Sequence, residues 1–317
     1  MAETANRFCV FVHTNDKQYV GAVVSAYSMR RRSATPDAFE VRIIRREDFP
    51  FFERYQGRLY LRDGSWKPWL NEDLQSFTPL RFAPPQLMDY SGRAVVVDPD
   101  IFAIGDVMEL FRRDMQGKAI MCRTHEGVKL AVRGRYASSV MLLDCAKLRH
   151  WDVERQFAQL FTGELDYRTW LGLEAEDPQT IGVLEPEWND FDRLTPETRM
   201  VHMTRRSTQP WKTGLKMDYL PVEHFKPFPP FGWLMKARRV LFGPYALLPR
   251  YRRHPDRRQE QLFFAYVREC LEQGLLSEAE LRRHIEQKHV RPDAFELVRS
   301  VPPLDEVLDF QPAARAA

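Results

Sequence analysis

The sequence has few cysteines and no long apolar run, and both absences narrow the kind of protein it can be. Its four cysteines are far apart and form no CxxC pair. This spacing argues against a disulfide framework or a zinc finger and predicts reduced thiols, mostly buried in strands. No uncharged apolar stretch approaches the roughly 20 residues that cross a bilayer. The first residues form neither a basic leader nor a long apolar region, so we expect a cytoplasmic protein that is not secreted.

Low-complexity tracts, repeats and a large net charge are also missing. The net charge is +3 over 317 residues, of which 44% are hydrophobic and 12% aromatic, a composition that can build a sizeable core. The positive charge is uneven, because residues 233–258 hold eight Lys or Arg and one acidic residue, Asp256. Prolines cluster at 227–230 and between 244 and 255. We therefore predict a compact domain over residues 1–226 and a mainly helical, basic extension over residues 227–317.

Apolar runs of strand composition alternate with helical patterns along the first domain. This alternation predicts an α/β fold, in which helices cover both faces of a mixed sheet and ligands bind outside the carboxyl ends of the strands. The expected strands are residues 7–13, 39–44, 93–97, 118–122 and 139–144, and the expected helices are residues 20–29, 78–90, a segment after Gly105, and residues 148–161.

Two aspartates at the end of one strand form the chemically richest place in the sequence. Residues 94–100 read AVVVDPD, so a buried strand delivers Asp98 and Asp100 to the sheet edge, where both carboxylates can bind one cation. Oxygen ligands suit Mg²⁺ or Mn²⁺, and such an ion neutralises a diphosphate leaving group. The residues alone leave an alternative open, in which Asp98 caps the next turn and Asp100 is solvated, because aspartates spaced in this way are common.

Five segments, in a fixed order, set these aspartates in a wider pattern. They are FVHTNDKQY (11–19), the run from TPLRF to VVVDPD and MELF (78–111), YASSVMLLDC (136–145), LEPEWND (184–190) and VHMTRRSTQPWKTG (201–214). Together they resemble the glycosyltransferase A (GT-A) fold, and specifically the family-eight-like group of galactosyl- and glucosyltransferases. The resemblance covers about residues 7–218, and its order makes it more specific than the aspartate pair.

This resemblance implies a metal site. Its ligands would be Asp98, Asp100 and His202, and its ion Mn²⁺ or Mg²⁺. From the residues alone, the alternative is that His202 is a core histidine. Pro99 stands where the family has a small residue, which rigidifies the turn without removing a ligand.

The resemblance also implies contacts to a nucleotide-sugar donor. Asp16 and Tyr19 match the residues that contact the nucleoside, and Arg81 stands where a basic or polar residue contacts the donor. Lys212 could pair with a phosphate as a point charge. Trp211 is either a donor contact or an anchor in the core.

The acceptor side departs from the family. Its Asp-Gln-Asp segment has no clear counterpart, which leaves Asp166 and Tyr167 as substitutes and the stereochemistry open. Asp190 and Asp192 are expected to be solvated loop residues, and if the reaction inverts, a carboxylate of this region such as Asp190 would be the general base. His13 and His125 show no partner in the sequence and receive no role.

The resemblance thus implies a metal-dependent glycosyltransferase that moves a hexose from a nucleoside-diphosphate sugar, expected to be a UDP-sugar, to an acceptor hydroxyl. Two other classes stay open. In a haloacid-dehalogenase-type phosphatase, Asp98 would be the nucleophile and Asp100 the general acid, but Ile101 and Phe102 do not supply the hydroxylic residue that follows there. A non-catalytic nucleotide-binding module on the same scaffold would bind a nucleotide without turnover.

The basic segment 233–258 indicates where the acceptor is expected to be. Arginines and lysines alternate there with aromatic and aliphatic residues, a pattern that suits the anionic inner face of the cell membrane, where a lipid-linked glycan precursor would be the acceptor. The alternative is a solvated helix whose arginines lie along its apolar surface. No nucleic-acid-binding motif accompanies the charge, so we expect no nucleic-acid partner.

Overall fold

A six-stranded mixed sheet forms the centre of the molecule, in a computed structural model that describes residues 7–125, 135–218 and 250–310, with positions 237 and 241 between them. Its strand order is β2-β1-β5-β8-β7-β9. The first three of these strands are parallel, β8 is antiparallel to β5 and to β7, and β9 is parallel to β7. The strands are β1 (Phe8–Thr14), β2 (Glu40–Arg45), β3 (Leu59–Arg62), β4 (Ser65–Pro68), β5 (Arg93–Val97), β6 (Ile101–Ala103), β7 (Ile120–Thr124), β8 (Tyr136–Asp144), β9 (Ile181–Val183), β10 (Asp190–Phe191) and β11 (Met200–His202).

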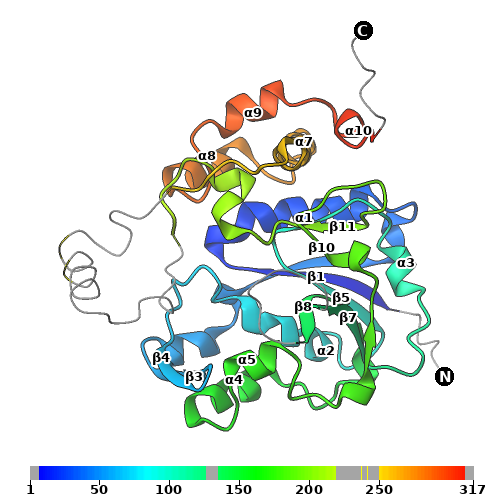
Figure 1. Cartoon of the computed structure of the whole chain (residues 1–317), viewed down its shortest axis with the longest axis vertical. Helices are drawn as coiled ribbons and strands as arrows, with labels where there is room; N and C mark the ends of the chain where they lie inside the picture. The colour runs from blue at the N-terminus through cyan, green and yellow to red at the C-terminus, as the bar shows by residue number, and fades with distance from the viewer. Residues whose placement is uncertain (1–6, 126–134, 219–236, 238–240, 242–249, 311–317) are drawn as a thin grey trace.

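Helices cover both faces of this sheet (Figure 1). Successive residues of a strand point to opposite faces, so Cys9 and Phe11 of β1 pack toward α4 and α5, whereas Val10 and Val12 pack toward α1. The predicted mixed sheet flanked by helices is therefore confirmed. The helices are α1 (Tyr19–Arg31), α2 (Pro84–Leu87), α3 (Met108–Phe111), α4 (Val153–Thr162), α5 (Tyr167–Leu171), α7 (Arg257–Glu272), α8 (Glu278–Glu286), α9 (Ala294–Ser300) and α10 (Leu304–Val307).

Two of the expected helices differ from the prediction. The segment 78–90 divides into a 3₁₀ helix, Thr78–Phe82, and the single turn of α2, because prolines lack the N–H that a continuous helix needs. The helix expected at 148–161 begins later, at Val153, where the Asp152 side chain accepts a hydrogen bond from the Arg155 amide. That bond marks an N-cap.

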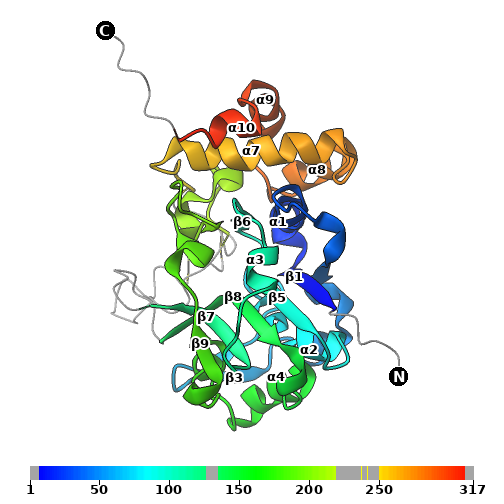
Figure 2. The same cartoon turned by 90° about the vertical axis from the view of Figure 1, so that its right-hand side faces the viewer.

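The C-terminal helices form an outer layer on α1 (Figure 2), so the predicted helical extension is confirmed. Helix α7 shares a hydrophobic core with α1, β11 and Trp211. The hydroxyl of Tyr266 in α7 donates a hydrogen bond to the carbonyl oxygen of Ala103, at 2.7 Å. The predicted boundary at 226 and 227 lies outside the described residues. Over the part of the chain that the structure describes, no helix is both long and apolar enough to cross a membrane.

The four cysteines are free and buried, as predicted for reduced thiols. Cys9 and Cys122 lie in strands. Cys145 lies in a 3₁₀ helix after β8, and Cys270 lies in α7. The expectation that most of them lie in strands therefore holds for two of the four.

Candidate metal and donor site

The sheet topology brings the candidate ligands to one edge. Strands β1 and β5 are parallel neighbours, with Val12 opposite Val97, so His13 and Asp98 leave the sheet side by side. Strand β8 runs the other way, with Val140 opposite Val97. Its first residues therefore lie beside the carboxyl end of β5, the side where such sheets bind ligands.

A second, small sheet brings His202 to the aspartates. Strand β6 follows them directly and pairs with β11, which places His202 opposite Ile101. The Met203 amide donates to the carbonyl oxygen of Asp100, at 3.0 Å. Helix α1 approaches the same turn so closely that a Cβ on Gly21 would lie 2.7 Å from the Pro99 carbonyl oxygen. A glycine is therefore needed at this point of the helix.

Asp98 is buried between two basic side chains. The Arg81 guanidinium forms a bidentate ion pair with it, with Nε 2.9 Å from Oδ1, and His13 Nε2 lies 2.8 Å from the same oxygen. Burial alone would raise the pKa of Asp98, but Arg81 and then His13 outweigh it and hold that pKa below its usual range. Burial lowers the pKa of His13, against the opposing effect of Asp98. The carboxylate is thus ionised beside a neutral imidazole at neutral pH.

Asn189 and Ser139 orient His202 beside Asp100. The Nδ1 atom of His202 lies 2.8 Å from Asn189 Oδ1, and Asn189 in turn donates from Nδ2 to Ser139 Oγ, at 2.9 Å. An amide oxygen only accepts, so a proton is on Nδ1, and Nε2 is the nitrogen that a metal ion would bind. That Nε2 lies 3.4 Å from Asp100 Oδ1, a buried oxygen without a hydrogen-bond partner among the described residues.

These residues fit a divalent cation. One ligating atom from each of Asp98, Asp100 and His202 lies within 4.8 Å of the others. Two carboxylates and a neutral imidazole suit Mn²⁺ and also accommodate Mg²⁺. The orphaned oxygen of Asp100 and Nε2 of His202 are the atoms that such an ion would bind.

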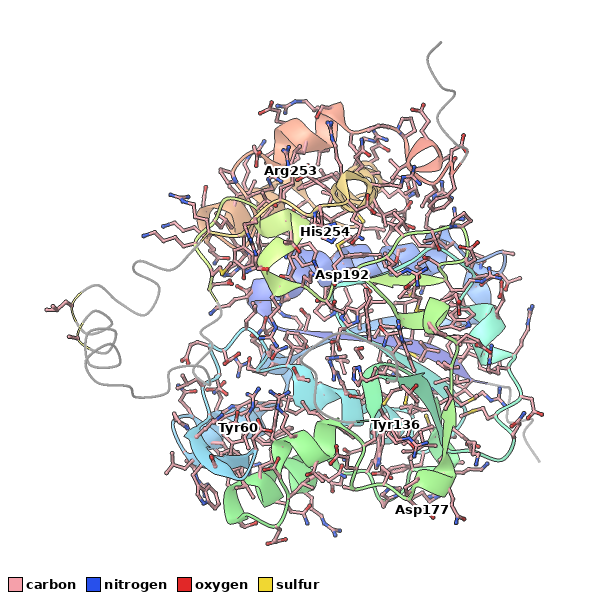
Figure 3. The ribbon with its side chains drawn as sticks, viewed as in Figure 1. Tyr60, Tyr136, Asp177, Asp192, Arg253 and His254 are labelled. Carbon is pink, nitrogen blue, oxygen red and sulfur yellow. The ribbon has the colours of Figure 1, made fainter. Side chains whose placement is uncertain are left out.

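The cluster opens into a cavity of about 250 Å³ at the sheet edge. Of the predicted site residues, Asp98, Asp100, His202 and Arg81 line it. Its walls come from the 3₁₀ helix before α2, from α5, from the start of β8, where Figure 3 labels Tyr136, and from the segment after β11. Besides Arg81, three more arginines line the cavity, and so its charge suits an anionic ligand. These arginines are Arg62, Arg168 and Arg206.

Asp16 and Tyr19 do not line this cavity. They lie at the carboxyl end of β1, as predicted, but they contact the C-terminal helices. The Tyr19 ring stacks on His284 of α8, with ring centroids 5.8 Å apart, and Asp16 Oδ2 lies 3.7 Å from His289 Nδ1.

Trp211 and Lys212 also lie away from the cavity. Trp211 is 1% exposed, and its ring packs on Phe263 of α7, which is the core-anchor alternative. Lys212 is equally buried, and its ammonium pairs with Asp218. Burial lowers the pKa of Lys212, although Asp218 opposes this. A phosphate would have to displace Asp218 to reach this ammonium.

The carboxylates predicted for the acceptor side form hydrogen bonds that connect elements of the fold. Asp166 caps α5 by accepting from the Arg168 amide at 2.7 Å, and its other oxygen accepts from the Gly64 amide at 2.9 Å. Its neighbour Tyr167 does line the cavity. Asp190 lies outside the cavity lining, and its Oδ2 accepts from Thr198.

The expectation that Asp190 and Asp192 are solvated is wrong. Asp190 is buried, and burial raises its pKa. Asp192 accepts hydrogen bonds from the Thr204 hydroxyl and the Arg205 amide, and it lies beside His254 (Figure 3), with Oδ1 3.8 Å from Nε2. Both carboxylates connect β10 to neighbouring segments.

Sequence reasoning missed the supporting residues of the cluster. His13 received no role, although its place at the end of the strand beside β5 was the available signal. Gln209, whose Nε2 donates to Asp100 Oδ2 at 3.1 Å, gave no signal, because nothing in the sequence links positions 100 and 209.

Comparisons with known proteins bear on this site. No family model matches the sequence. Protein CDI of Arabidopsis thaliana is 28% identical over 224 residues, which are 64% of this chain and 79% of that protein.

Several solved structures to which the chain is similar are glycosyltransferases. The galactosyltransferase LgtC, in complex with donor and acceptor sugar analogs, is 15% identical with a TM-score of 0.43, over 64% of this chain and 89% of that one. The glycosyltransferase GlyE of Streptococcus pneumoniae is 13% identical with a TM-score of 0.45, over 67% and 57% of the two chains. Mouse xyloside xylosyltransferase 1 is 16% identical with a TM-score of 0.40, over 63% and 98%.

Proposed function

We propose that this protein is a metal-dependent glycosyltransferase that moves a hexose from a nucleoside-diphosphate sugar to an acceptor hydroxyl. One observation carries the proposal. Side chains from separate segments of the family-eight-like pattern converge on one cavity or on the side chains that line it. These side chains are Arg81, Asp98, Asp100, Ser139, Asn189 and His202.

Four of these residues, and Arg206 beside them, would act directly on the donor. Asp98, Asp100 and His202 would hold Mn²⁺ or Mg²⁺, and the bound ion supplies charge neutralisation to the diphosphate leaving group. Arg81 and Arg206 line the same cavity and add fixed positive charge near the diphosphate. The fixed donors and charges lower the barrier by positioning and electrostatic stabilisation. We infer a UDP-sugar as the donor from the family resemblance.

A panel of nucleotide-sugars tests this function. We expect a UDP-hexose to raise the thermal unfolding temperature and to be slowly hydrolysed, both only with Mn²⁺ or Mg²⁺. Asp100→Asn and His202→Ala should each reduce hydrolysis at least about tenfold, because loss of an outer-shell partner alone has an effect of that size. The exposed Asp89 and His150 provide matched controls, so Asp89→Asn and His150→Ala should behave as the wild type.

Other outcomes separate the rival functions. A response that needs no metal and survives both ligand substitutions would sink the proposed site. Nucleotide binding without turnover toward any acceptor would indicate a binding module. Release of phosphate from simple phosphoesters, lost in Asp98→Asn, would indicate the phosphatase, which the isoleucine and phenylalanine of β6 after the aspartates already disfavour.

We further propose that the acceptor is a glycan or lipid-linked precursor at an anionic membrane surface on the cytoplasmic side. Most of the basic, aromatic segment 233–258 lies outside the described residues. Of its described arginines, Arg250, Arg252, Arg253 and Arg257 are exposed. Sedimentation with anionic vesicles should fall several-fold, and more at low salt, when Arg250, Arg252 and Arg253 are changed to Gln. Unchanged sedimentation of that variant would exclude these arginines as the anchor.

A further inference from the structure

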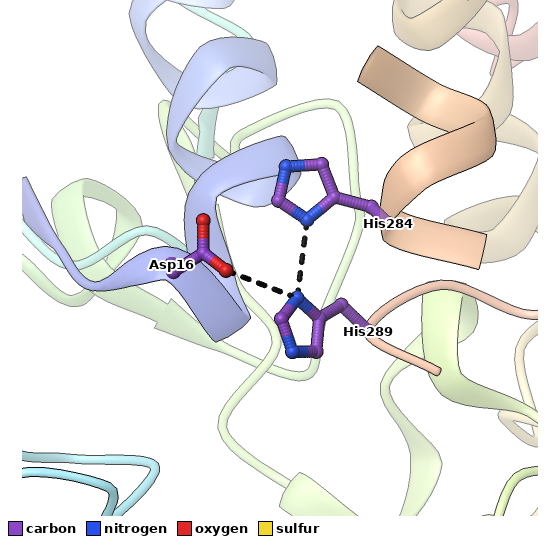
Figure 4. A group of neighbouring side chains, drawn as sticks. All are labelled: Asp16, His284 and His289. Atoms are coloured by element: carbon purple, nitrogen blue, oxygen red, sulfur yellow. Dashed lines mark hydrogen bonds and ion pairs between the residues drawn. The ribbon is translucent and has the colours of Figure 1, made fainter. Parts of the chain in front are cut away.

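A second group of potential metal ligands lies outside the cavity, between the end of β1 and the C-terminal helices (Figure 4). Asp16 belongs to the 3₁₀ helix Asp16–Gln18 that follows β1, His284 lies in α8, and His289 follows that helix. The Nδ1 atoms of the two histidines lie 3.1 Å apart. Asp16 Oδ2 is 3.7 Å from His289 Nδ1. The three ligating atoms thus face one another.

At least one of the two facing histidine nitrogens carries a lone pair that points toward the other two ligating atoms. Two Nδ1 atoms 3.1 Å apart have room for a single proton between them, so at least one of them is unprotonated. Arg283 Nη2 lies 3.1 Å from His284 Nε2, and a guanidinium only donates. The His284 proton is therefore on Nδ1, and the lone pair belongs to His289 Nδ1.

We propose that Asp16, His284 and His289 form a zinc site that fastens the C-terminal helices to the end of β1. In a tetrahedral site with bonds of about 2.0 to 2.1 Å, neighbouring ligand atoms lie about 3.3 Å apart, and the two measured separations lie on either side of that value. Two imidazoles and a carboxylate are ligands of zinc, whereas Mg²⁺ and Ca²⁺ prefer oxygen. His284 is fully buried, but Asp16 is partly exposed, which leaves a fourth position for water.

Two arginines beside this group are electrostatically unfavourable to a bound cation, and one of them must move when zinc binds. Asp16 Oδ1 lies 3.5 Å from Arg45 Nη2 and 3.6 Å from Arg283 Nη2, while Oδ2 faces the histidines. When zinc takes Nδ1 of His284, the imidazole carries its proton on Nε2 instead, and Arg283 must leave that nitrogen. The Arg283 side chain is half exposed, so it can turn toward solvent while it stays near Asp16 Oδ1.

Cobalt binding tests this site in the full-length chain. Asp100→Asn and His202→Ala are first combined to remove the ligands at the cavity. After treatment with a chelator, this protein should bind one equivalent of Co²⁺ with the visible absorption of four-coordinate cobalt, and Zn²⁺ should displace it. His289→Ala should weaken zinc binding more than about 100-fold, since even an outer-shell change weakens it 10- to 100-fold. Asp16→Asn, which keeps the side-chain volume, should weaken it in the same direction.

Two more variants sharpen the test. Arg283→Gln removes the competing donor and a positive charge, so it should increase zinc affinity, whereas His150→Ala at a distant exposed histidine should not change it. Cobalt binding that is unchanged in both His289→Ala and Asp16→Asn would overturn the site, and so would the absence of any four-coordinate spectrum. These readouts need no nucleotide-sugar, so they do not depend on whether the proposed transferase activity is found.

Discussion

Asn189 determines which nitrogen of His202 is available to a metal ion. Its amide oxygen accepts from Nδ1 of His202, and its amide nitrogen is held by Ser139. With Nδ1 engaged by Asn189, Nε2 faces Asp100 and is the nitrogen that a metal ion would bind. Outer-shell partners of this kind fix the tautomer and orientation of a ligating histidine. Asn189 is thus a positioning residue rather than a ligand.

Replacing Asn189 should therefore weaken metal binding without removing a ligand. We expect Asn189→Ala to lower Mn²⁺ affinity about 10- to 100-fold, measured by the electron paramagnetic resonance signal of free Mn²⁺ during titration. Asn189→Asp keeps an oxygen that accepts from Nδ1, so it should retain most of the affinity. Equal binding by the alanine variant and the wild type would show that Asn189 does not orient His202.

The sequence predicted which candidate ligands lie together better than it predicted their partners. The buried strand before Asp98 and the ordered motifs placed the two aspartates, His202 and Arg81 together. The sequence did not predict that Arg81 and His13 would both contact Asp98. Such pairs depend on which strands are neighbours and how helices pack, and no local pattern records contacts between residues so far apart in the chain.

At the scale of elements, sequence reasoning missed a hairpin that contributes Arg62 to the cavity lining. Strands β3 and β4 are joined by Asp63 and Gly64, which have φ values of 52° and 68°. An Asp-Gly pair with both φ values positive is typical of a two-residue hairpin turn, so the signal was present in the sequence. The long strands and α1 were predicted well because their apolar patterns are long. The two- and three-residue strands β6, β9, β10 and β11 are too short to show a pattern.

This hairpin gives Asp166 a structural task. Asp166 caps α5 and also accepts from the Gly64 amide of the turn. Asp166→Ala should therefore lower the free energy of unfolding by about 1 kcal/mol, as for loss of an N-cap, measured by urea denaturation. Metal-dependent hydrolysis of the donor should stay within about twofold of wild type, because in this arrangement the carboxylate does not line the cavity.

Asp152→Ala provides the matched control. Asp152 is the N-cap of α4 as Asp166 is of α5, but no residue of α4 lines the cavity. Both variants should lose similar stability. A loss of hydrolysis confined to Asp166→Ala and exceeding about 100-fold would contradict the structural assignment and restore Asp166 as a catalytic candidate.

At the scale of the whole molecule, the C-terminal helices and the sheet domain share buried surface. Trp211 comes from the segment after β11, and its ring packs on Phe263 of α7 and on Phe102 of β6. The change in composition near residue 226 predicted an appended region, but composition cannot show that α7 completes the core over α1. That contact depends on which face of α1 the sheet leaves uncovered.

The four buried thiols can test whether these parts unfold together. Cys9, Cys122 and Cys145 lie in the core between the sheet and α4, and Cys270 lies in the core between α1 and α7. Burial raises the pKa of each thiol to about 12, and the thiolate is the reactive form. We therefore expect no labelling of the native protein by N-ethylmaleimide.

In increasing urea, mass spectrometry of labelled peptides reports the opening free energy at each cysteine. We expect all four to become reactive with one common urea dependence, because α7 cannot leave α1 without exposing the core that both share. A cysteine introduced at the exposed Ser65 gives the labelling rate of an unprotected thiol. Labelling of Cys270 at low urea, while the other three stay protected, would instead mean that the C-terminal helices open as a separate unit.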